Sequence, residues 1–324
     1  MQTRQKRLRT PWWIPILLVA AASIPVSLGA SELVFKVEDP FGDDFGDGRM
    51  EYPLRSDMER GDLDLLEFSA KQGEDGTWFR VVFARPIREP GREAADPFGT
   101  PRASRARHDF YTFNIDLYID TDRQPGSGQV SMLPGRQAEV AAPYAWEKVV
   151  ALTPRPEVLR ASLHRLRVRE WHDQESRKRS VSRSEVRQRK RQIAEELMPI
   201  IYFPNHTRVV GRRIDFFVPR AFLNGEARDD WGYVLVVTGA VLEQRFSIPF
   251  LSKWSQEYSD GLLMPVVPGR DQNAFGGGLR FEPLQPPLID ILVPPGDQQE
   301  RILASFDSYQ EQRAQIPGIV PAEY

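Results

Sequence analysis

Cysteine is absent from this sequence of 324 residues, and histidine occurs only four times. The lack of cysteine excludes disulfide bonds, thiolate zinc sites, iron–sulfur clusters and cysteine nucleophiles. Common catalytic motifs are missing too: there is no G-x-S-x-G, no H-E-x-x-H, no Walker loop and no G-x-G-x-x-G after a strand. We therefore expect a protein that is not an enzyme. A glycoside hydrolase with two carboxylates far apart in the chain is the remaining catalytic alternative.

Proline and glycine, in contrast, are plentiful, with 27 and 23 residues. Both residue types favour strands and turns over long helices. With 41% hydrophobic and 27% charged residues, the chain can bury a substantial core, and global disorder is excluded.

The first thirty residues have the pattern of an export signal. Residues 4–9 carry four positive charges, and residues 12–30 are uncharged. A basic start, an apolar run and small residues before Ser31 are typical of a secretory signal peptide. The uncharged run also approaches the roughly 20 residues that span a bilayer, so an uncleaved anchor is the alternative. Either way we expect an exported chain, periplasmic or on the cell surface, and membrane-anchored if the signal is not cleaved.

Charge is distributed unevenly over the rest of the chain. Without residues 1–30 the net charge falls from −2 to −6, because four positive charges leave with them. Residues 155–191 carry thirteen Arg or Lys and five Asp or Glu, a local charge of +8, which leaves the remainder at −14. An acidic body with one basic segment is therefore expected.

Short alternating segments predict a protein made mostly of β-strands. Residues 110–120 (FYTFNIDLYID) alternate as a strand does, and residues 232–242 form a near-continuous apolar run that predicts a buried central strand. Further strands are predicted at residues 32–38, 63–70, 77–84, 137–141, 147–152, 206–210 and 213–218. So many short strands and turns indicate an antiparallel β-sandwich.

The basic segment has helical periodicity instead. Leu159, Leu163 and Leu166 recur at helical spacing, and Ser182 or Ser184 can cap a second helix, which predicts a basic helical insertion at 155–200. It can bind an anionic polymer, a lipid surface or a protein partner, or form a solvated arm against the acidic body. Export and the lack of interleaved aromatic residues argue against nucleic acid. The candidate contacts to an anionic partner are Arg177, Lys178, Arg179, Arg183, Arg187, Arg189, Lys190 and Arg191.

The loop DPFGDDFGDG, at residues 39–48, is a candidate metal site. Ca²⁺ prefers about six to eight oxygen ligands from carboxylates and carbonyls, and glycine lets a short loop turn its carbonyls inward. The spacing is not that of an EF-hand, and a solvated turn whose aspartates bond their own backbone is the alternative. The predicted Ca²⁺ ligands are Asp39, Asp43, Asp44 and Asp47.

Aromatic residues are candidates for sugar contact, because sugar rings pack on exposed aromatic faces. Trp146 and Trp231 lie in strand-like blocks and are predicted to be buried. The carbohydrate-binding candidates, which have more polar neighbours, are Trp78, Trp171, Trp254 and Tyr258. Haem ligation by His108 and Met132 is a further hypothesis, although a histidine beside Arg and Asp is more often a surface residue.

Several sequence blocks together resemble one known family. The blocks are FKVEDPFGDDFGDGRMEYP (35–53), GDLDLLEFSA (61–70), YIDTD (118–122), LPGRQAEV (133–140), AWEKVV (145–150), WGYVLVVTG (231–239), NAFGGG (273–278) and LIDILVPPGDQQERIL (288–303). They are similar to the C-terminal binding module of glucodextranase and of related pullulanases, and they span most of residues 34–306. Residues 86–107 and 155–200 depart from that family's pattern.

This resemblance implies a DOMON-like or immunoglobulin-like β-sandwich at residues 31–310, interrupted by the insertion at 155–200 and followed by a tail at 311–324. It also implies a surface-associated or carbohydrate-binding accessory module. The residues that carry it are Asp39, Gly42, Asp43, Asp44, Gly46, Gly48, Tyr52, Pro53, Asp120, Gly135, Trp146, Trp231, Gly232, Tyr233, Gly276, Gly277 and Asp290.

Two classes of function follow. The first is an exported, non-catalytic module that binds carbohydrate or another polymer of the cell envelope, with or without Ca²⁺. The second is a periplasmic structural or assembly protein that holds a protein or anionic partner through the basic segment. A haem-binding electron carrier and a glycoside hydrolase are less favoured.

Overall fold

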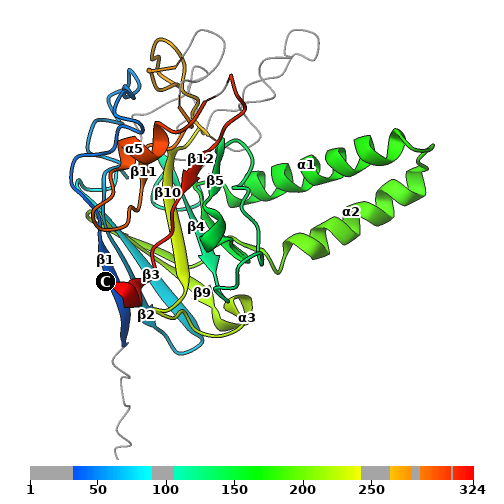
Figure 1. Ribbon diagram of the computed structural model, residues 1–324, viewed down its shortest axis with the longest axis horizontal. Helices are drawn as coiled ribbons and strands as arrows, with labels where there is room; N and C mark the ends of the chain where they lie inside the picture. The colour runs from blue at the N-terminus through cyan, green and yellow to red at the C-terminus, as the bar shows by residue number, and fades with distance from the viewer. Residues whose placement is uncertain (1–31, 90–105, 242–262, 279–284, 308) are drawn as a thin grey trace, which may run out of the picture. The chain divides into compact units, whose positions relative to one another are not determined.

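Two five-stranded sheets face each other across a hydrophobic core in the computed structural model (Figure 1). The structure describes residues 32–89, 106–241, 263–278, 285–307 and 309–324. The predicted export signal and much of the loop at 86–107 lie outside these residues. All the described residues belong to one unit, Ser31–Tyr324. The predicted β-sandwich, mostly antiparallel, is confirmed.

The first sheet pairs antiparallel throughout, in the order β1, β2, β3, β9, β8. Its strands are Leu33–Glu38 (β1), Leu65–Gln72 (β2), Gly76–Phe83 (β3), Thr207–Val210 (β8) and Arg213–Pro219 (β9). In β1, Phe35 and Val37 are buried, whereas Lys36 and Glu38 are exposed. This alternation follows from the two-residue period of a strand, and it gives the sheet one core face and one outer face.

The second sheet has the order β11, β10, β4, β6, β7, and only β6 and β7 run parallel. Its strands are Phe113–Asp120 (β4), Lys148–Leu152 (β6), Ile201–Tyr202 (β7), Gly232–Gly239 (β10) and Asp290–Ile291 (β11). Both β4 and β10 are buried along their whole length. Leu117 and Leu235 belong to the core between the sheets, whereas Tyr118 and Val234 belong to a second hydrophobic cluster. Burial on both faces explains the near-continuous apolar run in β10.

A parallel pair of short strands, β5 (Ala138–Val140) and β12 (Ala314–Ile316), contributes to the second cluster. The base of helix α1 and the short helix α5 (Gln299–Leu303) contribute to it as well. Residues 311–324, separated as a tail in the sequence, therefore contribute a strand to the fold, and Ile319 forms a bridge with Tyr233. The remaining short elements are α3 (Arg220–Leu223), η2 (Ala142–Tyr144) and η3 (Pro321–Glu323).

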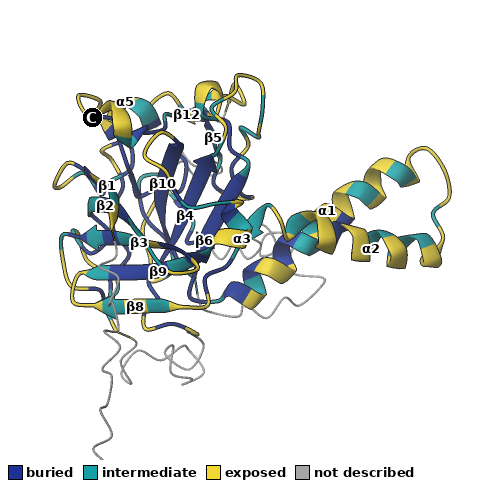
Figure 2. Cartoon of the chain, turned by 90° about the horizontal axis from the view of Figure 1, so that it is seen from below, coloured by how far each residue is buried: buried dark blue, intermediate teal, exposed yellow. Residues whose placement is uncertain are grey.

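The predicted basic insertion forms a hairpin of two helices between β6 and β7, α1 (Pro156–Ser176) and α2 (Arg183–Leu197). Leu159 and Leu163 anchor α1 in the second cluster. Ser182 begins α2 with a capping box, in which its hydroxyl accepts the Glu185 N–H and the Glu185 carboxylate accepts the Ser182 N–H. The far half of the hairpin is mostly exposed (Figure 2). In the part of the chain that is described, no helix combines the length and the hydropathy needed to cross a bilayer.

Candidate functional site

Three carboxylates meet where the edges of the two sheets come together. Asp39 directly follows β1, which is an edge strand of the first sheet, and Asp290 begins β11, which is an edge strand of the second. Asp43 belongs to the loop at residues 39–48, which we call the acidic loop. One oxygen of each carboxylate lies within 4.8 Å of the others. Residues remote in sequence are thus gathered at one point of the fold.

Backbone N–H groups fix the orientation of this acidic group. Three of them donate to carboxylates: Val293 to Asp39 Oδ1 at 3.0 Å, Leu65 to Asp290 Oδ2 at 2.6 Å, and Gly42 to Asp64 Oδ2 at 2.9 Å. The second oxygen of each of these carboxylates is buried and has no hydrogen-bond partner among the described residues, and neither has Oδ1 of Asp43. Asp290 is fully buried, Asp64 is 1% exposed and Asp39 is 9% exposed.

The surroundings disfavour negative charge on these carboxyl groups. Burial is the largest cause, and it raises the pKa of Asp39 to about 9, of Asp43 to about 7 and of Asp64 to about 6. Burial likewise raises the pKa of Asp290 well above its usual range, and the charges of Asp39, Asp43 and Asp64 raise it further. Protonation or a bound cation would compensate this unfavourable negative charge.

The buried amide of Gln299 fastens the acidic loop to β11. Its Oε1 accepts the Ile291 N–H at 2.7 Å, and its Nε2 donates to the carbonyl oxygens of Asp43, Gly46 and Ile289. Gly46 has a φ of +58°, and a Cβ at this position would lie 3.1 Å from the Leu288 carbonyl oxygen. The loop can approach β11 so closely because residue 46 is glycine.

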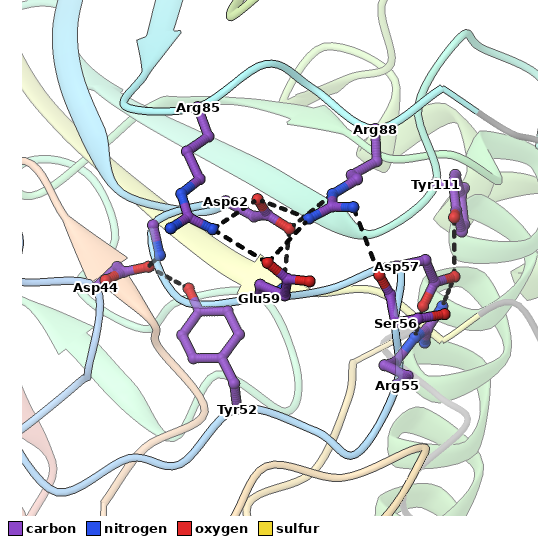
Figure 3. A network of polar contacts seen from close by, with 11 residues as sticks. Asp44, Tyr52, Arg55, Ser56, Asp57, Glu59, Asp62, Arg85, Arg88 and Tyr111 are labelled. Atoms are coloured by element: carbon purple, nitrogen blue, oxygen red, sulfur yellow. Dashed lines mark hydrogen bonds and ion pairs between the residues drawn. The ribbon is translucent and has the colours of Figure 1, made fainter.

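Asp44 and Asp47, the other two predicted metal ligands, have different partners. Oδ2 of Asp44 accepts the Tyr52 hydroxyl and, at 2.7 Å, the Gly61 N–H (Figure 3). Asp47 pairs with the guanidinium group of Arg49. The structure therefore brings together Asp39 and Asp43 of the predicted set and adds Asp64 and Asp290. The lone aspartate within the apolar run LIDILV was the sequence signal for Asp290, because a charge in a buried strand needs a partner.

The segment after the acidic loop is held by a separate polar network (Figure 3). Arg88 donates to Asp62 at 3.0 Å, and Arg85 pairs with Glu59 at 3.3 Å. Asp57 accepts the Tyr111 hydroxyl at 2.8 Å. These acids are compensated by arginine or hydroxyl groups, which distinguishes them from Asp39 and Asp290.

A second acidic group consists of Asp120, Asp122 and Glu147, whose oxygens also lie within 4.8 Å of one another. Its carboxylates accept hydrogen bonds from the Thr121 and Arg123 N–H groups and from the Ser127 hydroxyl. Within the described ranges, none of its oxygens is both buried and unpartnered. This group is an internally satisfied turn.

Trp78 lies on the outer face of the first sheet and is 37% exposed. Its ring is 5.3 Å from that of Phe217, which lies opposite it on β9. Beside the indole is a hollow of about 160 Å³ lined by Lys71, Trp78, Phe79, Arg80 and Asp215. Arg80 and Asp215 form a two-pronged ion pair, with Nε–Oδ1 at 2.5 Å and Nη2–Oδ2 at 3.2 Å.

The other aromatic candidates have different surroundings. Trp171 is half-buried in a groove between α1 and α2, beside Arg167, Glu170 and Gln174. Trp146 and Trp231 are 3% and 8% exposed, which confirms that they are buried. The remaining two candidates, Trp254 and Tyr258, lie outside the described residues.

The predicted anionic-partner residues run from the turn after α1 to the middle of α2, a segment that we call the hairpin end. Lys178 and Arg179 pair with Glu175, and Arg189 pairs with Glu196. The other five are exposed and have no ion pair within the described chain: Arg177, Arg183, Arg187, Lys190 and Arg191. The hairpin end is therefore a solvated, positively charged surface.

The two residues of the haem hypothesis belong to different parts of the fold. Nδ1 of His108 lies 3.0 Å from the Thr207 hydroxyl, and its ring stacks on Phe110 of the core between the sheets. Met132 packs in the second hydrophobic cluster.

The two facing sheets define the class of protein as a β-sandwich module. Residues 34–318 match the family model of the C-terminal, SLH-like binding module of glucodextranase, so the chain belongs to this family. The match extends beyond residue 306, where the sequence resemblance ends, and it includes β12. A search of curated proteins gives no match. Membership indicates a binding module of the cell envelope or cell surface.

Proposed function

We propose that this protein is an exported, non-catalytic module that binds a carbohydrate or another polymer of the cell envelope through the outer face of its first sheet. Family membership supports the class of function, and the exposed ring of Trp78 supports the location. A half-exposed indole on a regular strand offers an apolar face to a sugar ring without any rearrangement of the backbone.

The groups around Trp78 suit a polyhydroxylated ligand. Lys71 lies opposite Trp78 on β2, and Arg80 lies two residues along β3 on the same face. Together with Asp215 they supply fixed donors and acceptors beside the apolar ring. Precisely placed polar groups next to an aromatic surface are the usual composition of a small-molecule subsite. The Arg80–Asp215 pair holds this arrangement rigid before a ligand binds.

Affinity electrophoresis of residues 31–324 tests the proposal. Gels containing α-glucans, β-glucans or peptidoglycan fragments are compared with a gel that contains no polymer. We expect selective retardation by one polymer and a loss of roughly tenfold or more in affinity for Trp78→Ala, since a central tryptophan contact contributes about 1.4 kcal/mol or more. Uniform mobility in every gel contradicts the proposal.

The matched control is Trp171→Ala, which removes the other described tryptophan candidate from a different surface. If Trp171→Ala still binds the polymer and Trp78→Ala does not, the polymer-binding site is assigned to the outer face of the first sheet. The reverse pattern moves the site to the groove between α1 and α2. Circular dichroism of both variants verifies that the fold is intact.

A second candidate function rests on the five unpaired cations at the hairpin end. We infer that this surface holds an anionic partner, either a polymer or an acidic protein. The test replaces Arg187 and Arg191 with Glu and measures retardation by an anionic polymer at low and high salt. We expect binding to weaken with salt and to be lost in the double variant. Retardation that neither salt nor charge reversal changes contradicts it.

A further inference from the structure

The acidic group at the sheet edges has the composition of a hard-cation site. Its three converging carboxylates come from separate places in the chain: the end of β1 (Asp39), the acidic loop (Asp43) and the start of β11 (Asp290). In Asp39 and Asp290, one oxygen accepts a backbone N–H and the other is buried without a partner among the described residues. Such oxygens are pre-oriented for a ligand that accepts electron pairs.

Buried oxygens without partners distinguish this group from an ordinary acidic turn. Oδ1 of the fully buried Asp290 has no hydrogen-bond donor among the described residues, and neither has Oδ1 of Asp64. A buried carboxylate oxygen that is left unsatisfied costs free energy, so native proteins usually supply it with a partner. The compensated acids at Asp62 and at Asp120 show the more common arrangement in the same molecule.

We propose that Asp39, Asp43 and Asp290 bind a Ca²⁺ ion that joins the edges of the two sheets. Oxygens that contact one Ca²⁺ at about 2.3–2.6 Å can be at most about 5 Å apart. The three oxygens of Asp39, Asp43 and Asp290 meet this limit, because they lie within 4.8 Å of one another. Asp64 stands beside this set and supports the loop, because its Oδ2 accepts the N–H of Gly42, the residue before Asp43.

The donor set selects the kind of cation. All three side chains offer carboxylate oxygen, and the absence of cysteine from the chain removes thiolate ligands. Oxygen-only sites suit hard cations rather than zinc or copper. Mg²⁺ usually keeps several waters and takes only one or two carboxylates, whereas Ca²⁺ accepts a larger set of protein oxygens. Three converging carboxylates therefore favour Ca²⁺.

A bound Ca²⁺ would supply the partner that the buried oxygens of Asp39, Asp43 and Asp290 lack among the described residues. The proposal therefore distinguishes two states, Ca²⁺-free and Ca²⁺-bound. Because the ligands meet only in the folded chain, Ca²⁺ binding adds directly to the free energy of unfolding.

Thermal unfolding of the whole chain distinguishes the two states. The protein is treated with chelator, dialysed at pH 8 and melted with and without 1 mM CaCl₂. We expect CaCl₂ to raise the melting temperature by about 5 °C or more, and calorimetric titration with CaCl₂ to give one site per chain. No shift and no heat of binding overturn the proposal.

Asp290→Asn is the decisive variant. The amide keeps an oxygen for the Leu65 N–H but removes the charge, so we expect it to fold in chelator and to gain nothing from CaCl₂. Asp43→Asn, in the acidic loop, is a second variant with the same expected loss. If CaCl₂ raises the melting temperature of both variants as much as that of the parent protein, the proposal is overturned.

The matched control is Asp122→Asn, which removes a carboxylate from the satisfied acidic group. It should keep the full response to Ca²⁺, and a loss of response there, with Asp290→Asn unaffected, overturns the assignment. The readout involves no polymer, and Trp78 is not among the ligands. The Ca²⁺ site and the polymer-binding function can therefore fail independently.

Discussion

Asp290 on β11 and Leu65 on β2 connect the two sheets directly: the Leu65 N–H donates to Asp290 Oδ2 at 2.6 Å. The Val293 N–H makes the opposite connection to Asp39, at the end of β1. Asp290 and Asp39 thus each serve as an inter-sheet contact through one oxygen. Their other oxygens are left for the proposed cation.

The Leu65–Asp290 hydrogen bond gives the first prediction. In chelator, Asp290→Ala leaves a buried N–H without an acceptor and should lower the free energy of unfolding by about 1–3 kcal/mol. Asp290→Asn keeps an acceptor and should unfold at nearly the urea concentration of the parent protein. Urea titrations followed by circular dichroism measure both. Equal destabilisation by the two variants would show that the carboxyl group, not the hydrogen bond, is what matters.

A buried ion pair under the second cluster gives the second prediction. Arg136 donates to Asp116 through Nε at 2.6 Å and through Nη2 at 3.1 Å, and both side chains are almost completely buried. Arg136→Leu leaves a buried carboxylate without its cation and should lower the free energy of unfolding by about 3–5 kcal/mol. The double variant with Asp116→Leu should recover part of this loss.

The control for this pair is Arg228→Leu, which breaks an exposed contact with Asp230. Solvent and salt screen that contact, so the urea midpoint should hardly change. A loss as large as that of Arg136→Leu would contradict the distinction between buried and exposed pairs.

The third prediction concerns pH. Burial lowers the pKa of His108, and the charge of Arg107 lowers it further, while Asp109 acts in the opposite direction. The unfolded chain, with an ordinary histidine pKa of about 6.5, therefore binds a proton more readily than the folded chain. The stabilisation from neutral His108 is present above pH 6.5 and is lost as the pH falls below it.

Urea titrations of the parent protein and His108→Gln, between pH 8 and pH 5, isolate this contribution. Any titration of the acidic group is common to both proteins and cancels in the difference. We expect the stability advantage of the parent protein to shrink toward pH 5. A difference that is constant with pH would show that His108 does not titrate differently in the two states.

The fourth prediction concerns the start of α2. Ser182→Ala removes the hydroxyl that accepts the Glu185 N–H and should destabilise the first turn of the helix by about 1 kcal/mol. Faster hydrogen–deuterium exchange at residues 183–187 would reveal it. Ser180→Ala, which removes an exposed hydroxyl two residues before the cap, is the control and should leave exchange in this turn nearly unchanged.

Strand periodicity predicted most of the sandwich. The segment predicted at 147–152 forms Lys148–Leu152, and that at 213–218 forms Arg213–Pro219. The short strands β7, β11 and β12 were not predicted, whereas β5, with three residues, was predicted within 137–141. In strands of two or three residues the alternation is a weak signal. The helical hairpin was predicted because leucine spacing and serine capping are both local signals. Each of them is encoded within a few consecutive residues of the chain.

The acidic group was only half predictable from the sequence. Asp39 and Asp43 are neighbours in the chain, and their density in one loop indicated a site. Asp64 and Asp290 are brought to the same point by the packing of the two sheets, because β2 and β11 belong to different sheets and no local pattern encodes how these pack. Asp44 and Asp47 share the composition of the loop, but its path turns them toward Tyr52 and Arg49.

The contact between Asp39 and Val293 joins residues 254 positions apart. The residue after β1, the first strand to be synthesised, therefore gains this partner only when the chain is almost complete. A growing chain that has not reached residue 293 can pair β1 with β2, yet its acidic loop has nothing to close against. Long-range contacts of this kind slow folding, and strand edges left open meanwhile recruit other chains. A fragment that ends after β10 would keep nine of the ten strands of the two facing sheets and lack only β11. It should nevertheless aggregate, because the edge of β10 that pairs with β11 would be open.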